Sequence, residues 1–501
     1  MAKIKINGKE FEVENGKNLV DAAEENGIEI PHYCYHPGLS IAGQCRMCYV
    51  EQAGNPKLQV ACNMKCADGL DVVTDSAKVK DAVKWSLEFH LINHPIDCPI
   101  CDQAGECGLQ NYYMEVGKYQ SQMREHKVNK QKVVDLGDRI VLDKERCILC
   151  SRCVRFTQEV SKTAELGIYN RGDRSVIGTK EDLPMKDNYQ VNTVDICPVG
   201  ALTSKDFRFE QRVWFLKETA SVCNGCSQGC NVFVHHKAGK HVYRLKPRYN
   251  AEINSYWMCD FGRDTYKPAN YDRRFTTAQL GGVEMPTSEA VRSWVADLKT
   301  IITTERTDEV AVWIHPDMTN EELSSVIQHL KGEFGIGQYY SLNVEKIAAE
   351  DTTVDQLLHR KDPYCNSNGF LQTLTTNKLK LQSEKNLEER LANGKVSHLI
   401  LFCGEKNLSD EFFYRLQSKI SADCFTVLVG TQLEHTRIFP QALCVPTLAH
   451  YEKTGTIVNF KKIAQKIEAD FRMFKNAIST EELMSQLLQE YRKPTATRAE
   501  A

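Results

Sequence analysis

The length, composition and charge of this chain exclude several classes of protein. Its 501 residues, 42% of them hydrophobic and 26% charged, provide for a globular protein of roughly two to four domains. The 63 basic and 66 acidic residues leave a net charge of -3, which gives no general basic field for nucleic acid or anionic lipid. Residues 1–10 lack the apolar core of a signal peptide, and no apolar run is long enough to span a bilayer. We therefore expect a soluble chain that stays on the cytoplasmic side.

Cysteine usage narrows the class further. Of the 20 cysteines, 16 lie in the first 259 residues, mostly in groups spaced by two or three residues. A disulfide framework is typical of small domains in an oxidising compartment, which does not describe a long chain without an export signal. We interpret these groups as metal-binding sites.

The chain opens with the pattern of a small ferredoxin-like β-grasp domain. Two alternating runs, 3–6 and 10–14, are joined by Asn7-Gly8 and predict a hairpin. Residues 18–26 predict a short capped helix. A cysteine loop follows, with the spacing C-x10-C-x2-C-x13-C. We name its members the first set: Cys34, Cys45, Cys48 and Cys62.

Four thiolates suit a [2Fe-2S] cluster, although plant-type ferredoxins space their cysteines differently. The alternative is a zinc site. Gly38 and Gly43 favour the cluster, because a loop that wraps sulfide must let backbone N–H groups approach closely. Cys66 competes with Cys62 for the fourth position, and we expect Cys62 to be the ligand and Cys66 a spare thiol.

Residues 75–93 predict an amphipathic helix with an apolar stripe that belongs to the core. The helix is followed by a loop with the pattern H-x3-C-x2-C-x5-C. A histidine before proline is by itself more often a cap or a surface residue, but three cysteines without a nearby fourth favour a ligand role for it. The second set is therefore His94, Cys98, Cys101 and Cys107.

A C-x2-C-x2-C triplet with a distant Cys-Pro follows, which is the iron-sulfur pattern of bacterial ferredoxins. Zinc rarely uses such a triplet, because closed zinc sites prefer two separated pairs. Three arginines interleave with the thiolates, and they either offset cluster charge or form a solvated basic face: Arg146, Arg152 and Arg155. The third set is Cys147, Cys150, Cys153 and Cys197.

A further group has the spacing C-x2-C-x3-C-x28-C, for which we prefer a [4Fe-4S] cluster. A zinc site that also uses His235, His236 or His241 is the alternative. This fourth set is Cys223, Cys226, Cys230 and Cys259. The remaining cysteines are isolated in apolar or mixed segments and are expected to be small buried residues: Cys365, Cys403, Cys424 and Cys444.

From about residue 271 the pattern changes to strands alternating with helices, which indicates a parallel α/β layer. No G-x-G-x-x-G or Walker motif occurs, so we expect a scaffold and not a nucleotide site. The tail from residue 490 is expected to be loose. The predicted strands are 309–314, 398–402 and 425–429, and the predicted helices are 320–334 and 409–420.

Three segments carry a resemblance to a known family: 43–48 (GQCRMC), 94–107 (HPIDCPICDQAGEC) and 195–203 (DICPVGALT). Over residues 1 to about 265 the chain resembles the large iron-sulfur subunit of respiratory complex I, the G or 75 kDa-type subunit of NADH-quinone oxidoreductase. The resemblance implies a [2Fe-2S] cluster on the first set, a [4Fe-4S] cluster with one histidine ligand on the second, and an all-cysteine [4Fe-4S] cluster on the third. Some bacterial members carry an extra [4Fe-4S] cluster off the main path, and the fourth set matches its pattern.

Beyond residue 265 the family resembles molybdopterin oxidoreductases of the formate dehydrogenase type. Residues 259–263 (CDFGR) and 455–459 (GTIVN), with Gln465, are similar to landmarks of that fold. This chain is too short for a complete molybdopterin scaffold, so we expect a truncated α/β domain without molybdopterin.

The expected fold class is thus multidomain, α+β and α/β. It comprises a [2Fe-2S] ferredoxin-type domain at 1–78, a domain with two [4Fe-4S] clusters at 79–215, and a [4Fe-4S] domain of the Mo/W-bis-MGD type at 216–270. A truncated molybdopterin-oxidoreductase-like α/β domain at 271–490 and a loose tail at 491–501 complete the chain.

By the same resemblance, the chain conducts electrons from a flavin-bearing, NADH-oxidising subunit through further iron-sulfur subunits toward quinone. The whole complex couples this transfer to ion translocation. The subunit would lie on the inner side of the bacterial cell membrane, with membrane contact only through the complex and no nucleic acid as partner. An iron-sulfur subunit of a formate dehydrogenase or an NAD-linked hydrogenase complex is the alternative. An [FeFe]-hydrogenase needs an adjacent Cys-Cys pair that does not occur after Cys259, and iron analysis distinguishes a structural zinc protein.

Overall fold

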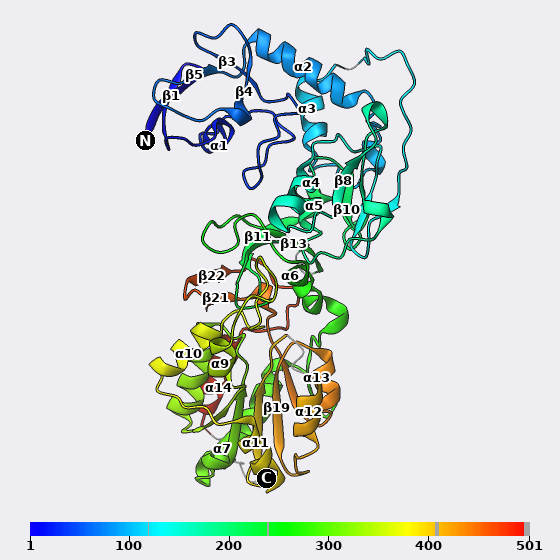
Figure 1. Cartoon of the computed structure of the whole chain (residues 1–501). Helices are drawn as coiled ribbons and strands as arrows, with labels where there is room; N and C mark the ends of the chain where they lie inside the picture. Colours follow the sequence, from blue (N-terminus) through cyan, green and yellow to red (C-terminus); the bar gives the residue numbers. More distant parts are fainter. Residues whose placement is uncertain (119, 238–239, 406–409, 495–501) are drawn as a thin grey trace. The chain divides into compact units, whose positions relative to one another are not determined.

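The computed structural model describes residues 1–118, 120–237, 240–405 and 410–494 (Figure 1). The chain divides into two compact units, Met1–Leu216 and Lys217–Ala501. No helix in the described part of the chain combines the length and the apolar character needed to traverse a lipid bilayer.

The first unit begins with a five-stranded sheet of order β2-β1-β5-β3-β4. Strand β1 pairs antiparallel with β2 and parallel with β5, and the two residues of the β1–β2 turn, Asn7 and Gly8, have φ values of 52° and 76°. Positive φ at both positions matches the twist of a tight hairpin, so the predicted hairpin is confirmed. Asn18 caps α1, as predicted. The bounds are β1 (Ala2–Ile6), β2 (Lys9–Val13), α1 (Leu19–Glu25), β3 (Tyr49–Gln52), β4 (Gln59–Val60), the 3-10 helix η1 (Ala61–Asn63) and β5 (Asp71–Val73).

Helix α2 (Ala77–Leu91) confirms the amphipathic helix predicted for residues 75–93. Ser76 caps it, and Val79, Val83 and Leu87 of the predicted stripe are buried. The chain then passes through the 3-10 helix η2 (Cys98–Ile100) into α3 (Gly108–Val116).

The rest of the first unit is built from short elements around a small antiparallel sheet of order β10-β7-β6. Strands β8 and β9 form a separate hairpin. The bounds are β6 (Val134–Asp135), β7 (Ile140–Leu142), α4 (Arg152–Arg155), the π-helical turn η3 (Phe156–Val160), β8 (Leu166–Tyr169), β9 (Val176–Thr179), α5 (Asn192–Asp195) and β10 (Leu202–Ser204).

The second unit opens with an antiparallel sheet of order β11-β12-β13, followed by the short helix α6. A hairpin from near the end of the chain, β21–β22, packs against β11. The bounds are β11 (Lys217–Val222), β12 (Asn231–Lys237), β13 (His241–Pro247), α6 (Asp260–Arg263), β21 (Thr454–Val458) and β22 (Ala464–Glu468).

A seven-stranded sheet of order β15-β14-β20-β19-β18-β16-β17 forms the centre of the second unit. The five strands β17, β16, β18, β19 and β20 are parallel, as the sequence predicts. The strands are β14 (Ala278–Leu280), β15 (Val283–Met285), β16 (Val310–Ile314), β17 (Gln338–Tyr340), β18 (His398–Phe402), β19 (Phe425–Gly430) and β20 (Leu443–Pro446).

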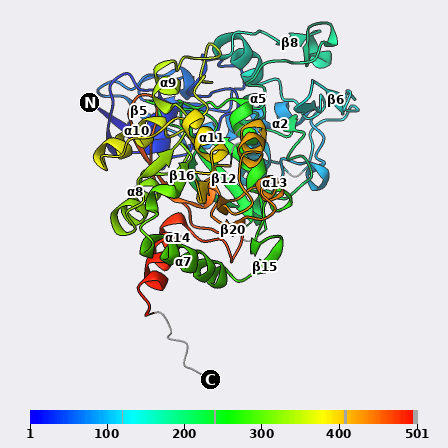
Figure 2. The same cartoon turned by 90° about the horizontal axis from the view of Figure 1, so that it is seen from below.

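Helices cover both faces of this sheet, because its central strands are apolar on both sides (Figures 1 and 2). Val312 faces the core built with α7, α8, α10 and α14, whereas its neighbours Ala311 and Trp313 face the core built with α11, α12 and α13. The helices are α7 (Thr287–Thr303), α8 (Asn320–Ile327), α9 (Val344–Ala349), α10 (Ser367–Thr376), α11 (Glu384–Ala392), α12 (Asp410–Gln417), α13 (Leu433–Ile438) and α14 (Thr480–Tyr491).

Two predicted helices are shorter than expected. The helix predicted for 320–334 is α8, which continues as the π-helical turn η10 (Gln328–Glu333), and the helix predicted for 409–420 is α12. Residues 406–409 lie outside the described part of the chain, as do residues 495–501 of the predicted tail.

Candidate iron-sulfur centres

The first set lies on the loop between α1 and β3 and on η1, and all four thiols are buried. The Cys45 thiol donates to Cys34, which lowers the pKa of Cys34 to about 5 and raises that of Cys45. In the same way, the Cys48 thiol donates to Cys62, which raises the pKa of Cys48 and lowers that of Cys62. On the same loop, Gly43 and Arg46 have φ values of 61° and 57°, which lets the backbone curl around the sulfurs.

The rival thiol, Cys66, is also buried, but in different surroundings. Burial raises its pKa, and the charged groups near it are Lys17 and Asp21. Cys62, in contrast, feels the charges of Cys34 and Cys45. The structure therefore gathers Cys62 with the other three thiols of the first set.

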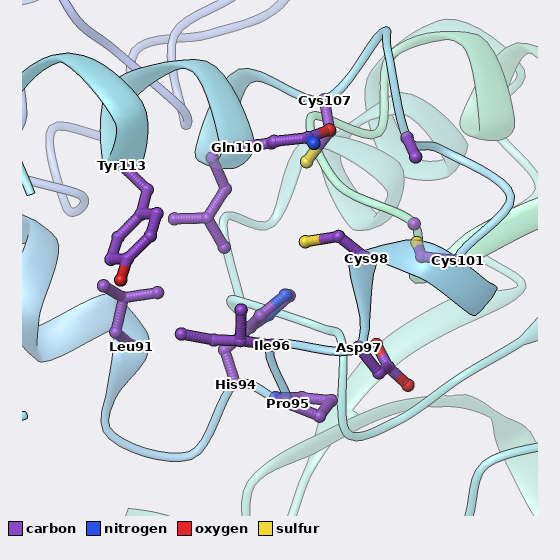
Figure 3. Close-up of a pocket in the computed structure, with 13 residues that line it drawn as sticks. Leu91, His94, Pro95, Ile96, Asp97, Cys98, Cys101, Cys107, Gln110 and Tyr113 are labelled. Atoms are coloured by element: carbon purple, nitrogen blue, oxygen red, sulfur yellow. The ribbon is translucent and has the colours of Figure 1, made fainter. Parts of the chain in front are cut away.

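The second set lines one pocket, at which α2, η2 and α3 meet (Figure 3). His94 follows the end of α2, Cys98 begins η2, and Cys107 precedes α3. In Figure 3 the sulfurs of Cys98 and Cys107 and the imidazole of His94 point into the same space. The other walls are mainly apolar: Leu91, Ile96, Ala104, Leu109 and Tyr113.

The His94 imidazole is held in its neutral form. Burial lowers its pKa to about 4, although Asp97 and the carbonyl of Arg146, which interacts with the ring, act in the opposite direction. The buried Nδ1 atom has no hydrogen-bond partner among the described residues. A buried, neutral imidazole with a ring nitrogen that has no hydrogen-bond partner among the described residues can serve as a metal ligand.

The third set lines a second pocket with walls such as Leu142, Ile177 and Leu202. Burial raises the pKa of Cys147 to about 12 and that of Cys150 to about 11. Leu149 and Ser151 have φ values of 54° and 61°, and the Leu149 N–H donates to Cys147 Sγ over 3.4 Å. The triplet loop therefore turns its backbone donors toward its own sulfurs.

The interleaved arginines do not form a solvated basic face. Arg155 is buried and donates to the carbonyls of Cys34 and Ser40. Arg152 donates to the carbonyls of Tyr35 and Ile196. These guanidinium groups bind the loop of the first set to that of the third.

Other contacts also connect the three sets of the first unit. The Tyr33 N–H donates to Cys45 Sγ over 3.5 Å, and the charge of Cys107 acts on the buried Tyr33 hydroxyl. At Gly200, three residues beyond Cys197, an added Cβ would lie 2.3 Å from Cys101 Sγ. The loop of each of these three sets therefore lies next to the loop of at least one other set.

The fourth set belongs to the second unit, and all its thiols are buried. The N–H groups of Gly225 and Gly262 donate to Cys223 Sγ and Cys259 Sγ, each over 3.3 Å. An added Cβ at Gly262 would lie 3.0 Å from Cys223 Sγ, so a side chain there would displace the thiol by a few tenths of an ångström.

The three histidines proposed as alternative zinc ligands lie on β12 and β13 and contact other residues. His235 pairs with Glu218 over 3.0 Å, His236 stacks on Phe471, and His241 packs against Tyr243. These contacts explain the histidines without a role at the fourth set.

Two residues that no sequence pattern indicates, His450 and Tyr451, support the fourth set. His450 Nε2 bonds the carbonyl of Val222 over 2.8 Å, and the Tyr451 hydroxyl donates to Asn224 over 3.2 Å. Both contacts span more than 220 residues of sequence, so no local spacing signals them. Gln465, noted as a landmark, donates to the carbonyl of Gly229 over 3.0 Å.

The donor chemistry of the four sets is rich in thiolates, which is the chemistry that holds iron-sulfur clusters. Within the described residues, no three or more histidine, cysteine, aspartate or glutamate side chains are grouped as a single metal ion requires. Of the remaining cysteines in the second unit, Cys365, Cys424 and Cys444 are buried, as expected, whereas Cys403 is only half-buried, because it lies just beyond the end of β18.

Models of known protein families match most of the cysteine-rich part. Residues 1–77 match a 2Fe-2S iron-sulfur cluster binding domain, and residues 84–122 match the iron-sulfur binding region of NADH-ubiquinone oxidoreductase-G. Residues 137–203 match the ferredoxin-like domain of NADH-quinone oxidoreductase subunit 3. Residues 216–270 match the molybdopterin oxidoreductase Fe4S4 domain.

Whole-protein relatives agree with these matches. The G subunit of NADH-quinone oxidoreductase from Rickettsia conorii is 36% identical over 344 residues, which cover 68% of this chain and 50% of the relative. The chain is a relative of the G subunit of NADH-quinone oxidoreductase. The G subunit from Streptomyces coelicolor is 41% identical over 56% of this chain and 33% of its own length. The mitochondrial iron-sulfur protein 1 of NADH dehydrogenase from Solanum tuberosum is 42% identical over 52% of this chain and 35% of its own length.

This chain spans half or less of the length of these three relatives. Among solved structures, a chain from an NAD+-reducing [NiFe]-hydrogenase is 27% identical, with a TM-score of 0.39, over 42% of this chain and 91% of its own. The family matches confirm the expected fold class at the level of ferredoxin-like iron-sulfur domains followed by a molybdopterin oxidoreductase Fe4S4 domain. They also confirm that the chain has domains for both 2Fe-2S and 4Fe-4S clusters.

Proposed function

We propose that the chain is an electron-transfer subunit of the peripheral arm of NADH-quinone oxidoreductase. The observation that carries this proposal is the set of contacts between neighbouring ligand loops in the first unit, through Arg152, Tyr33 and Gly200. Redox centres held on such loops lie near one another, as a relay requires. Its electrons come from a flavin-bearing subunit that oxidises NADH and leave through other iron-sulfur subunits toward quinone, with ion translocation in the complete complex.

The cofactors assigned under this proposal are one [2Fe-2S] cluster and three [4Fe-4S] clusters. The first set holds the [2Fe-2S] cluster, and the second set, with His94 as its nitrogen ligand, holds a [4Fe-4S] cluster. The third and fourth sets each hold an all-cysteine [4Fe-4S] cluster, with no molybdopterin in the chain. The donor sets fit these groups, because thiolates and a neutral imidazole are available in buried sites.

When bound, the clusters supply one-electron redox centres, and the side chains of this protein make or break no substrate bond. The chain excludes water by burying the thiols of the first and fourth sets and most of those of the others. Backbone N–H groups aimed at Cys45, Cys147 and Cys223 stabilise negative charge on sulfur. His94 carries less negative charge than a thiolate, which raises the reduction potential of its site.

We also propose that the predicted domain boundaries, 1–78, 79–215, 216–270 and 271–490, delimit functional parts. The α/β domain then serves as a shortened molybdopterin-oxidoreductase-like scaffold, because side chains from its loops, such as His450 and Gln465, support the fourth set. The subunit reaches the inner face of the bacterial cell membrane only through the complex.

The test is iron and acid-labile sulfide content of the purified protein, together with electron paramagnetic resonance spectra recorded over a range of temperatures. We expect about 14 iron atoms per chain and one [2Fe-2S] signal beside the [4Fe-4S] signals. Cys62→Ser should remove the [2Fe-2S] signal, whereas the matched variant Cys66→Ser should retain it. A protein that contains zinc and no labile sulfide would contradict the proposal.

A further inference from the structure

An ion pair joins the loop of the second set to the loop of the third. Asp97 directly precedes Cys98, and Arg146 directly precedes Cys147. The guanidinium of Arg146 donates twice to the Asp97 carboxylate, from Nε to Oδ1 over 3.1 Å and from Nη2 to Oδ2 over 2.8 Å. A two-pronged pair of this kind fixes orientation as well as distance. It therefore holds the two ligand loops in one relative position.

Further contacts anchor both partners of this pair. The Arg146 N–H donates to Asp143 over 3.2 Å, and Arg146 Nε lies 3.4 Å from the same carboxylate. Lys132 lies 3.3 Å from Asp97 and 2.8 Å from Glu145. Arg146 and Asp143 are each only 5% exposed. Water therefore screens the Arg146 charge far less than that of a surface arginine.

Arg146 also faces the second set directly. Its carbonyl interacts with the His94 ring, and its side chain reaches Gly200. A Cβ added at Gly200 would contact both Cys101 Sγ at 2.3 Å and Arg146 Cδ at 3.7 Å. Arg146 thus acts on the charge of the His94 ring and lies near the Cys101 thiol of the second set, although it belongs to the loop of the third set.

We propose that the Asp97–Arg146 ion pair is a latch between two cluster-bearing loops, and that Arg146 is a positioning residue that also tunes the cluster on the second set. This inference rests on the proposed function, because it requires clusters on both sets. The latch fixes the spacing of two neighbouring redox centres. The buried positive charge favours the reduced, more negative form of the cluster beside it, and the Asp97 carboxylate limits that effect.

The test compares D97N, R146Q and R146K in the cluster-loaded full chain. The signal of the second set is first identified as the one that changes in H94C. R146Q should lower its midpoint potential, because the positive charge is lost, and D97N should raise it, because the same charge is no longer balanced. R146K should leave the potential close to that of the wild type. All three variants should lose iron to a chelator several-fold faster than the wild type, because none of them keeps the ion pair with two hydrogen bonds. In R146K the charge remains, but a lysine cannot reproduce the two-pronged contact.

K205Q is the matched control, since it removes a 2.9 Å ion pair between Lys205 and Asp135 that is exposed on the same unit. It should change neither potential nor iron retention. Shifts of R146Q and D97N in the same direction would overturn the tuning role, and wild-type iron retention in all three variants would overturn the latch. If R146Q fails to fold, D97N and R146K decide the question. An unloaded wild-type chain would instead contradict the proposed function itself.

Discussion

At the scale of single residues, Gly200 has no room for a side chain. Its position is set by close approach and not by backbone strain, because an added Cβ would lie 2.3 Å from Cys101 Sγ and 3.1 Å from Gln103 Cβ. Gly200→Ala must push a ligand of the second set aside, with a packing cost of about 1–3 kcal/mol. We expect the variant to lose about four iron atoms, measured by iron content, together with the signal of the second set.

A second glycine provides the control for this change. Gly337 has nothing within 4 Å of an added Cβ. Gly337→Ala should therefore keep the full iron content and every signal. Full loading of Gly200→Ala would show that the second set does not need the close approach.

Glu405 is a buried carboxyl group, and its burial makes the ionised form unfavourable in the folded protein. Burial raises its pKa to about 7, although Lys453 and Arg274 act in the opposite direction. Its carboxylate accepts from the backbone N–H of His450, and Oε2 has no partner among the described residues. Because the folded-state pKa lies above the unfolded value, the favourable contribution of Glu405 is complete below the unfolded pKa. It is lost as pH rises through about 7.

Glu405→Gln should remove this pH dependence, because an amide keeps the acceptor oxygen and never ionises. From pH 5 to pH 8.5 the stability of the variant relative to the wild type should rise by about 2.5 kcal/mol. Thermal unfolding of the loaded protein at both pH values measures the difference. An equal gap between the two proteins at both values would show that ionisation of Glu405 is not responsible.

At the scale of elements, the β21–β22 hairpin supports the loop of the fourth set. Gln465 on β22 donates to the carbonyl of Gly229 and accepts from the amide of Asn231. Gln465→Leu keeps the side-chain size but leaves two buried polar groups unpaired, at a cost of about 1–3 kcal/mol each. We expect faster loss of iron from the fourth set under a chelator, with the signals of the other three sets unchanged.

The exposed Gln441 offers a comparison of the same chemistry. Gln441→Leu should leave the fourth set fully loaded. Equal iron loss in both glutamine variants would point to a general effect of the added apolar surface.

Local patterns in the sequence were sufficient to predict the elements that carry the ligands. The period of α2, the Asn7-Gly8 turn and the strands β16, β18 and β19 follow from nearest-neighbour rules, and the structure confirms them. Contacts between distant segments have no such signal. The support of Val222 by His450 and the Arg146–Asp97 pair depend on packing that only the folded chain defines. The π-helical end of α8 likewise departs from the regular helix predicted there.

At the scale of the whole chain, the ligand sets are divided between the two units. The first three sets lie in Met1–Leu216, where their loops contact one another, and the fourth lies in Lys217–Ala501. The supports of the fourth set, including His450 and Gln465, also belong to the second unit. In the proposed function the relay therefore uses the three sets of the first unit, and the fourth set lies outside it.

Cys223→Ser tests this division in the assembled complex. We expect the iron content of the complex to fall by about four atoms, with one [4Fe-4S] signal lost and the other cluster signals retained. Because the relay uses only the sets of the first unit, NADH-to-quinone turnover should stay within about twofold of the wild type, a change of less than about 0.5 kcal/mol in the activation barrier. Cys150→Ser is the counterpart on the proposed path, and it should abolish turnover in a complex of normal subunit content. Equal loss of turnover in the two variants, with normal assembly, would place the fourth set on the path of electrons.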